Sequence, residues 1–98
     1  MTRLSVRRSA ERELIAAAAW YERQQEGLGR EFLEELGRAF ERIKESPLTY
    51  PPWQEDAPYR KFLLQRFPYA VFYVENDSQV SVVAVAHGRR KPGYWVHR

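Results

Sequence analysis

The sequence of 98 residues contains no cysteine. Without a thiol the chain can form neither a disulfide nor a thiolate metal site, which excludes a disulfide-stabilised scaffold and a cysteine-type zinc domain. Only two histidines are present, His87 and His97, and no third ligand type is spaced to join them. We therefore expect neither a metal nor any other cofactor.

Long apolar runs are also missing. No segment approaches the roughly 18 consecutive apolar residues that a membrane-spanning helix needs, and residues 1–13 lack the apolar core of a secretory signal. The sequence also has no glycine-rich phosphate loop, no His-Glu-x-x-His motif and no Gly-x-Ser-x-Gly nucleophile elbow. We expect a soluble, cytoplasmic protein that has no membrane partner and belongs to none of these enzyme classes.

The composition is that of one folded domain covering residues 1–98. Hydrophobic residues make up 44% of the chain and aromatic residues 14%, which argues against disorder. The net charge is +3, and the excess lies in the second half: residues 1–47 carry nine Lys/Arg and nine Asp/Glu, whereas residues 48–98 carry seven and four. This imbalance is compatible with a polyanionic partner.

The N-terminal half predicts a short strand followed by a helix. Residues 3–7 alternate between polar and apolar side chains, which is typical of a strand with one buried face. Ser9 stands where an N-cap is expected, and the helix should run to about Gln25, with Gly27 at a left-handed C-cap. The apolar residues expected to face the core are Leu14, Ile15, Ala17, Ala18 and Tyr21, with Trp20 beside them.

A second helix should open at Gly29 or Arg30 and end before Pro47. The short link at residues 27–29 favours an antiparallel helix hairpin. Its apolar stripe has the spacing of one helical face and consists of Phe32, Leu33, Leu36, Phe40 and Ile43.

The opposite face of this second helix is charged. Glu34 is within i,i+4 reach of Arg38, and Glu41 is within i,i+3 reach of Lys44. The simplest interpretation is a solvated face laced by such pairs.

The second half predicts a proline-rich loop and three strands. Residues 47–58 hold four prolines together with Tyr50 and Trp53, which indicates an ordered crossing loop pinned to the core by its aromatics. Three runs rich in Val, Phe, Tyr and Leu follow, separated by turn signals at residues 66–68 and 76–78, and they predict an antiparallel meander of strands at residues 60–64, 69–75 and 79–87. The fold class is therefore α+β, in the order β-αα-βββ, with an antiparallel helix hairpin packed on a four-stranded, mostly antiparallel sheet.

Basic and aromatic residues gather around these strands. They flank the second strand or follow the last one, and they are Arg60, Lys61, Arg66, Arg89, Arg90, Lys91, Tyr94 and Trp95. Arginine can fork onto phosphate and aromatic rings can stack on bases, so this composition is typical of an RNA site. A solubilising basic tail is the equally simple alternative.

The segment Arg66-Phe67-Pro68-Tyr69-Ala70-Val71-Phe72-Tyr73, the strand 80–86 ending in His87-Gly88-Arg89-Arg90, and the β-αα-βββ order resemble the RelE/ParE family of bacterial type II toxins. This resemblance implies a toxin held inactive by a cognate antitoxin, whose flexible C-terminal segment wraps the toxin and whose N-terminal domain binds operator DNA. Within the family, RelE-like members cleave mRNA on the ribosome without a metal, and ParE-like members inhibit DNA gyrase. The partner implied beyond the antitoxin is therefore DNA gyrase or, alternatively, the ribosome and mRNA.

The matching residues favour the ParE-like side. By resemblance, RelE-like enzymes take basic residues from the second strand, an arginine from the third, an arginine after the fourth and a tyrosine near the C-terminus. Lys61 and Arg90 match this pattern, and Tyr94 fits with a shift. Leu63 stands where a second lysine would be and Ala70 where the third-strand arginine would be. Losing one donor to a transition state costs on the order of 10²–10³ in rate, which makes a binding inhibitor the preferred interpretation.

Three hypotheses follow from these residues. For a gyrase inhibitor, the target-binding residues are Arg60, Lys61, Arg89, Arg90, Lys91, Tyr94 and Trp95. For a ribosome-dependent mRNA endonuclease, the catalytic candidates are Lys61, Arg66, His87, Arg90 and Tyr94. A third possibility is a degenerate family member that keeps only antitoxin binding.

Three residues of the third and last predicted strands need an interpretation of their own. His87, beside two arginines, is either a general base or a strand-ending residue that hydrogen-bonds the tail. Tyr69 and Tyr73 lie four residues apart on one strand face, and we expect them to pack in the core.

Overall fold

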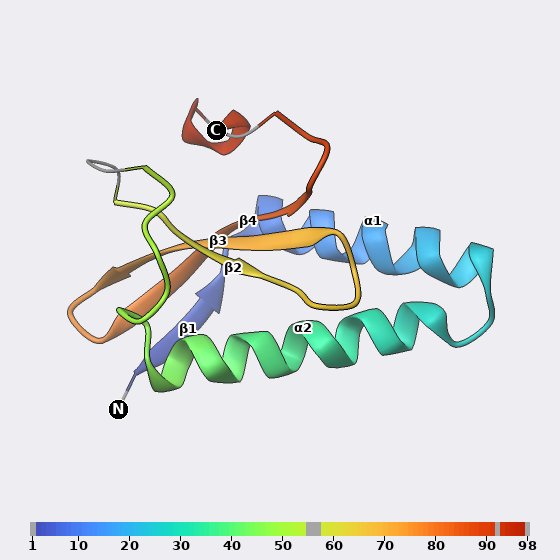
Figure 1. The fold of residues 1–98 in the computed structure, drawn as a ribbon, viewed down its shortest axis with the longest axis horizontal. Coiled ribbons are helices and arrows are strands. Elements are labelled where there is room, and N and C mark those ends of the chain that lie inside the picture. The colour runs from blue at the N-terminus through green and yellow to red at the C-terminus, as the bar shows by residue number, and fades with distance from the viewer. Residues whose placement is uncertain (1, 55–57, 92, 98) are drawn as a thin grey trace.

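The computed structural model describes residues 2–54, 58–91 and 93–97. The elements follow the predicted β-αα-βββ order, with a short 3-10 helix added at the end (Figure 1). They are β1 (Arg3–Val6), α1 (Arg8–Gln24), α2 (Leu28–Glu45), β2 (Arg60–Leu63), β3 (Tyr69–Asn76), β4 (Gln79–His87) and η1 (Tyr94–His97). No helix in this described part of the chain is long and apolar enough to cross a membrane.

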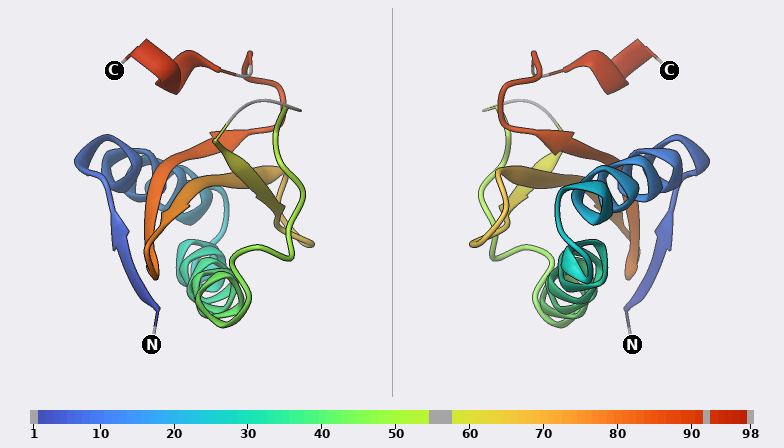
Figure 2. Two further views of the ribbon diagram at one scale, coloured as in Figure 1. Left: turned by 90° about the vertical axis from the view of Figure 1, so that its left-hand side faces the viewer. Right: turned by 90° about the vertical axis from the view of Figure 1, so that its right-hand side faces the viewer.

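The sheet has the strand order β1-β4-β3-β2, so the first and the last strand of the sequence lie side by side. Strands β2, β3 and β4 form the predicted antiparallel meander, whereas β1 pairs in parallel with β4, as at Leu4 and Val80. A parallel pair cannot be joined by a tight turn, and here the helix hairpin, β2 and β3 all lie between β1 and β4 in the chain. The two helices cover one face of the sheet, and the C-terminal segment lies across the other (Figure 2). We call this segment, residues 88–91 and 93–97, the tail.

The link between the helices differs in detail from the prediction. Ser9 lies inside α1, whose N-cap is Arg7 and has no side-chain cap hydrogen bond. Gly27 does adopt a left-handed conformation (φ 87°), but it is the N-cap of α2, because α1 already ends at Gln24 and has its C-cap at Gln25. The Glu22 carboxylate accepts hydrogen bonds from the backbone N–H groups of Gly27 (2.9 Å) and Gly29 (3.0 Å), and so satisfies donors at the start of α2.

The helix stripes are correct in phase but wrong at two positions. Phe32, Leu36 and Ile43 are fully buried, as predicted, and Phe40 is partly buried and packs against the same core, whereas Leu33 is exposed. Ile15 on α1 is exposed as well. The buried stripes are completed by two small residues that the prediction left out, Ala10 and Ala39.

Strand β4 is buried on both faces, and a β-bulge divides it. Phe72 pairs with Ala84 but the next residue, Tyr73, pairs with Val82, so Val83 is inserted between them. Val82 packs with the helix-side core before the bulge and Val85 does so after it, whereas Val83 and Ala84 pack on the other side. Burial of both faces explains why this run shows no alternation of apolar and polar residues in the sequence, and the inserted residue explains why Val82 and Val85, three positions apart, pack on the same side.

The turn between β3 and β4 fixes the register of that hairpin. Asp77 (φ 49°) and Ser78 (φ 64°) are both left-handed, as a two-residue turn that follows the twist of the strands requires. Asn76 and Gln79 then pair directly across it.

The crossing loop is held by aromatic contacts, as predicted. The Tyr73 hydroxyl donates to the Pro47 carbonyl (2.5 Å), and burial raises the pKa of Tyr73 to about 12, which keeps the phenol a donor. The Tyr50 ring packs on Phe62, with centroids 4.7 Å apart. Tyr73 is fully buried and Tyr69 packs against the same cluster, which confirms their predicted role in the core.

The buried stripe of α2 gives a direct test of the core. Replacing Phe32 with alanine should lower the free energy of unfolding by about 3–5 kcal/mol, because it removes a fully buried ring. Phe40→Ala should cost less, since that ring is partly exposed, and Glu41→Ala should stay within about 0.5 kcal/mol. Chemical denaturation measures all three variants, and a larger loss for Phe40→Ala than for Phe32→Ala would contradict this assignment.

Candidate target-binding site

A hollow of about 210 Å³ opens on the face of the sheet opposite the helices, and we call it the tail pocket. Its apolar floor and wall include Leu63, Ala70, Phe72, Ala86 and Trp95, and its basic rim consists of Lys61, His87 and Arg90. The meander brings these residues together from the ends of β2, β3 and β4 and from the segment that follows β4. The pocket therefore combines apolar surface with positive charge.

Hydrogen bonds of the backbone N–H groups fix the path of the chain just after β4. The Gly88 N–H donates to the Pro68 carbonyl (2.7 Å), which ties this exit to the β2–β3 turn. The Arg90 N–H donates to the His87 carbonyl (3.0 Å), and the Arg89 N–H donates to His87 Nδ1 (3.0 Å). Because Nδ1 accepts a hydrogen bond, the neutral imidazole carries its proton on Nε2.

Arg90 is held in place by two contacts. Its guanidinium lies 3.6 Å from the centroid of the Tyr94 ring, and its Nη1 lies 3.6 Å from Glu13 Oε2. The same carboxylate accepts a hydrogen bond from the Tyr94 hydroxyl, and its other oxygen accepts from the Val85 N–H (3.0 Å). One side chain of α1 therefore joins β4, the rim arginine and the tail.

Glu13 is the site residue that the sequence analysis missed. Its side chain is only 13% exposed, so it lies at the edge of the core and not on the solvated face of the helix. A signal was available, since Glu13 lies three residues after Ala10 and four before Ala17, both of which are buried. That spacing places the carboxylate beside the buried stripe of α1.

Tyr69 contacts the rim residue His87 and is influenced by the charge of Glu13. Its ring meets His87 edge to face at 5.2 Å. Burial, followed by the negative charge of Glu13, raises the pKa of the Tyr69 phenol, so it remains neutral at physiological pH.

The predicted target-binding residues divide into two groups. Lys61, Arg90 and Trp95 line the tail pocket, and Tyr94 supports Arg90. Trp95 belongs to the core there, because it is 3% exposed and its ring lies 4.0 Å from that of Phe72.

The remaining predicted cations lie elsewhere. Arg89 and Lys91 are exposed. Arg60 donates to the carbonyls of Leu48 (3.3 Å) and Tyr50 (2.7 Å), so it braces the crossing loop. Arg66 forms an ion pair with Glu31 of α2 at 2.8 Å. The structure therefore does not bring Arg60 or Arg66 to the tail pocket.

The family model for the ParE toxin of the type II toxin-antitoxin system parDE matches residues 4–92. The chain belongs to the ParE toxin family. A solved structure titled "Chromosomal ParDE TA system from P. aeruginosa" has the same fold as this ParE-family toxin, with a TM-score of 0.64 over 89% of this chain and 96% of that one, at 16% identity. No curated protein matches the sequence.

Removing the Glu13 carboxylate should loosen both the tail and the end of β4. We expect Glu13→Ala to lower the free energy of unfolding by about 1–3 kcal/mol, because it leaves the Val85 N–H and the Tyr94 hydroxyl without their acceptor. Trypsin should also cut the variant faster at residues 89–91. Glu11→Ala, on the exposed side of the same helix, is the matched control and should change neither measurement.

Proposed function

We propose that this ParE-family toxin arrests growth by binding DNA gyrase through the rim of the tail pocket and the neighbouring Arg89, and that a cognate antitoxin neutralises it. The observation that carries the proposal is the composition of the pocket. Leu63 and Ala70, the two positions at which the RelE-like pattern has cations, both line the tail pocket as apolar side chains.

The chemistry of RNA cleavage supports this choice. A metal-free nuclease must activate the 2′-hydroxyl, neutralise charge on the phosphorane and protonate the leaving oxygen. Lys61 and Arg90 are the cations on the pocket rim, and Glu13 partly offsets the charge of Arg90. An apolar floor with a basic rim instead suits a protein surface that presents an apolar side chain beside acidic groups.

The alternative function is a ribosome-dependent, metal-free mRNA endonuclease. One observation favours it, because Lys61, His87 and Arg90 surround the same hollow and Tyr94 lies directly against Arg90. In that case Arg90 would stabilise the phosphorane, and His87, whose Nδ1 already accepts a hydrogen bond, would exchange a proton through Nε2.

Replacing Arg89 and Arg90 together with alanine separates these functions from the fold. We expect the double variant to lose growth arrest on induction and remain folded, because the packing of β4 comes from residues 80–86. In the parent, supercoiling by purified gyrase should fall and ribosome-bound message should stay intact. Metal-independent cuts in the message that disappear in Arg90→Ala would overturn the gyrase assignment.

Arg30→Ala is the control for this experiment, since Arg30 is an exposed arginine on α2 that lies outside the tail pocket. It should arrest growth as the parent does. A parent that fails to arrest growth but still binds its antitoxin would identify a degenerate member of the family.

The outer face of α1 supports the antitoxin part of the proposal. Trp20 is 49% exposed, and Ile15, Ala16 and Ala19 are exposed beside it. Arg8, Arg12 and Arg23 lie on the same side by helical spacing. An exposed helix face on which arginines alternate with apolar residues suits an amphipathic segment that presents both apolar and acidic side chains.

This face can be tested without touching the tail pocket. Ile15→Arg combined with Trp20→Arg should weaken the complex with the antitoxin encoded by the adjacent reading frame at least tenfold, because both changes replace an apolar side chain of this face with a charged one. Growth arrest by the toxin alone should persist. Leu48→Arg is the matched control, since Leu48 is equally exposed but follows α2. Titration calorimetry measures the affinities, and an unchanged affinity in the double variant would contradict this surface.

A further inference from the structure

Strand β2 forms one edge of the sheet, and part of its backbone faces outward. The Leu64 N–H donates to the Tyr69 carbonyl (3.0 Å), toward β3. Because the backbone groups of successive residues alternate in direction in an antiparallel pair, those of Lys61 and Leu63 point away from β3. The bond from the Lys61 N–H to the Pro51 carbonyl (3.1 Å), on the outer side, confirms this phase.

Both ends of this edge are already covered, but its middle is open. Pro51 lies against Lys61 at one end. At the other end Glu35 Oε2 accepts hydrogen bonds from the N–H groups of Gln65 (2.7 Å) and Arg66 (3.2 Å). Between them, the N–H and C=O of Leu63 have no hydrogen-bond partner within residues 2–54, 58–91 and 93–97. An unpaired edge of this kind accepts an added strand.

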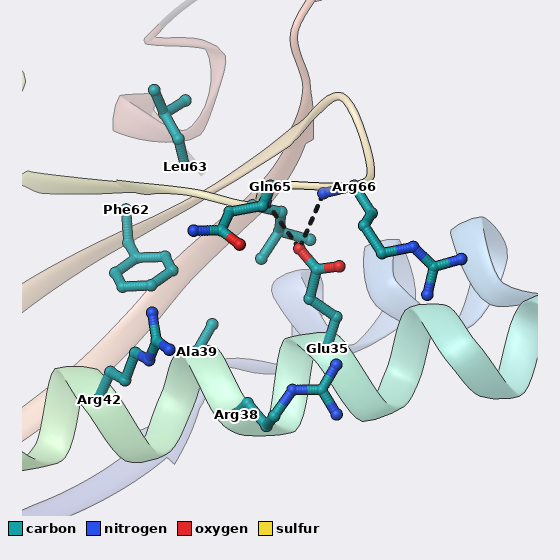
Figure 3. A pocket seen from close by; sticks show the side chains of 9 residues that line it. Glu35, Arg38, Ala39, Arg42, Phe62, Leu63, Gln65 and Arg66 are labelled. Carbon is teal, nitrogen blue, oxygen red and sulfur yellow. Dashed lines mark hydrogen bonds between the residues drawn. The ribbon is translucent and has the colours of Figure 1, made fainter.

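A groove of about 140 Å³ runs beside this edge, between β2 and α2, and we call it the β2 groove. Figure 3 shows Arg42 extending from α2 toward Phe62, while Glu35 reaches the backbone after β2 and Leu63 points away from the helix. Leu63 is 64% exposed. The groove therefore has an apolar side chain on each face of the strand and arginines along one wall.

Arg38 and Arg42, the two arginines that α2 contributes to the groove, form no ion pair in the described part of the chain, whereas Arg66 of the same groove is paired with Glu31. The expected pair between Glu34 and Arg38 is not formed, although the other expected pair, between Lys44 and Glu41, is present at 3.4 Å. Arg38 and Arg42 lie one helical turn apart, where like charges repel. A carboxylate placed between them would relieve this repulsion.

We propose that the β2 edge binds an extended, acidic peptide segment of a partner protein, which adds a short strand beside Leu63. Alternate side chains of an added strand point to opposite faces, so carboxylates on one face meet Arg38 and Arg42, and apolar side chains on the other face meet Leu63. This surface lies apart from the outer face of α1 and goes beyond the binding of gyrase.

Proline at position 63 tests the backbone part of the proposal. The Leu63 N–H points outward, so Leu63→Pro removes the donor without breaking a bond to β3, which is where an edge strand tolerates proline. Leu63→Ala keeps the N–H and is the control. The probe is the capped peptide Ser-Val-Glu-Val-Glu-Val-Ser, and NMR titration of the labelled protein reports its binding. We expect shifts at Leu63, Gln65 and Arg42 in the parent, and at least tenfold weaker binding by Leu63→Pro than by Leu63→Ala.

The charge requirement is tested independently. Arg38→Glu combined with Arg42→Glu should weaken binding of the acidic peptide at least tenfold, whereas Arg30→Glu, on the same helix, should have little effect. The same peptide with lysine in place of glutamate should bind the parent at least tenfold more weakly. Absence of binding to the parent at millimolar peptide, equal binding of the lysine peptide, or shifts confined to the tail pocket would each overturn the proposal. If Leu63→Pro is unfolded by circular dichroism, the arginine variants decide the result.

Discussion

Strand β4 lies inside the sheet and is buried on both faces, so two separate layers must cover it. The helix hairpin covers one face, with Phe32 and Leu36 in the core there. On the other face the cover comes from Trp95 of the tail and Trp53 of the crossing loop, whose rings lie 5.1 Å apart. The tail is therefore a structural layer, and the position of Arg90 at the rim follows from the need to bury the second face of β4.

The parts of the fold that the sequence predicts are those fixed by local patterns. The Val-rich runs predict the strands, and Phe32, Leu36 and Ile43 predict the buried side of α2, because their periodicity reports which face is covered. The bulge at Val83 could not be predicted in this way, since β4 is apolar on both faces and its sequence has no alternation that an inserted residue could interrupt. The cap of α2 also escapes prediction, because it comes from Glu22 in the preceding helix and not from a residue next to the helix start.

The candidate site, like the fold, was predictable where local sequence determines it and not where tertiary contacts do. That cations gather where β4 ends can be read from the sequence, whereas their pairing depends on tertiary contacts. Arg60 and Arg66 resemble Arg90 in the sequence, but Arg60 binds loop carbonyls and Arg66 pairs with Glu31, so neither reaches the tail pocket. Glu13 lies far from Arg90 in the chain and meets it only because the start of α1 lies beside the end of β4.

Leu63 belongs to both of the proposed binding surfaces. Leu63 lines both the tail pocket and the β2 groove, and its backbone N–H and C=O point away from β3 at the edge of the sheet. A peptide strand added along β2 would pack its apolar side chains on Leu63 and would extend the sheet beside Lys61, on the pocket rim. An occupant of the edge would therefore change the shape and the charge of the pocket next to it. Two sites are coupled when a ligand at one of them changes the affinity of the other for its own ligand. Since Leu63 lies in both surfaces, it is the residue through which binding at the sheet edge would change binding at the tail pocket.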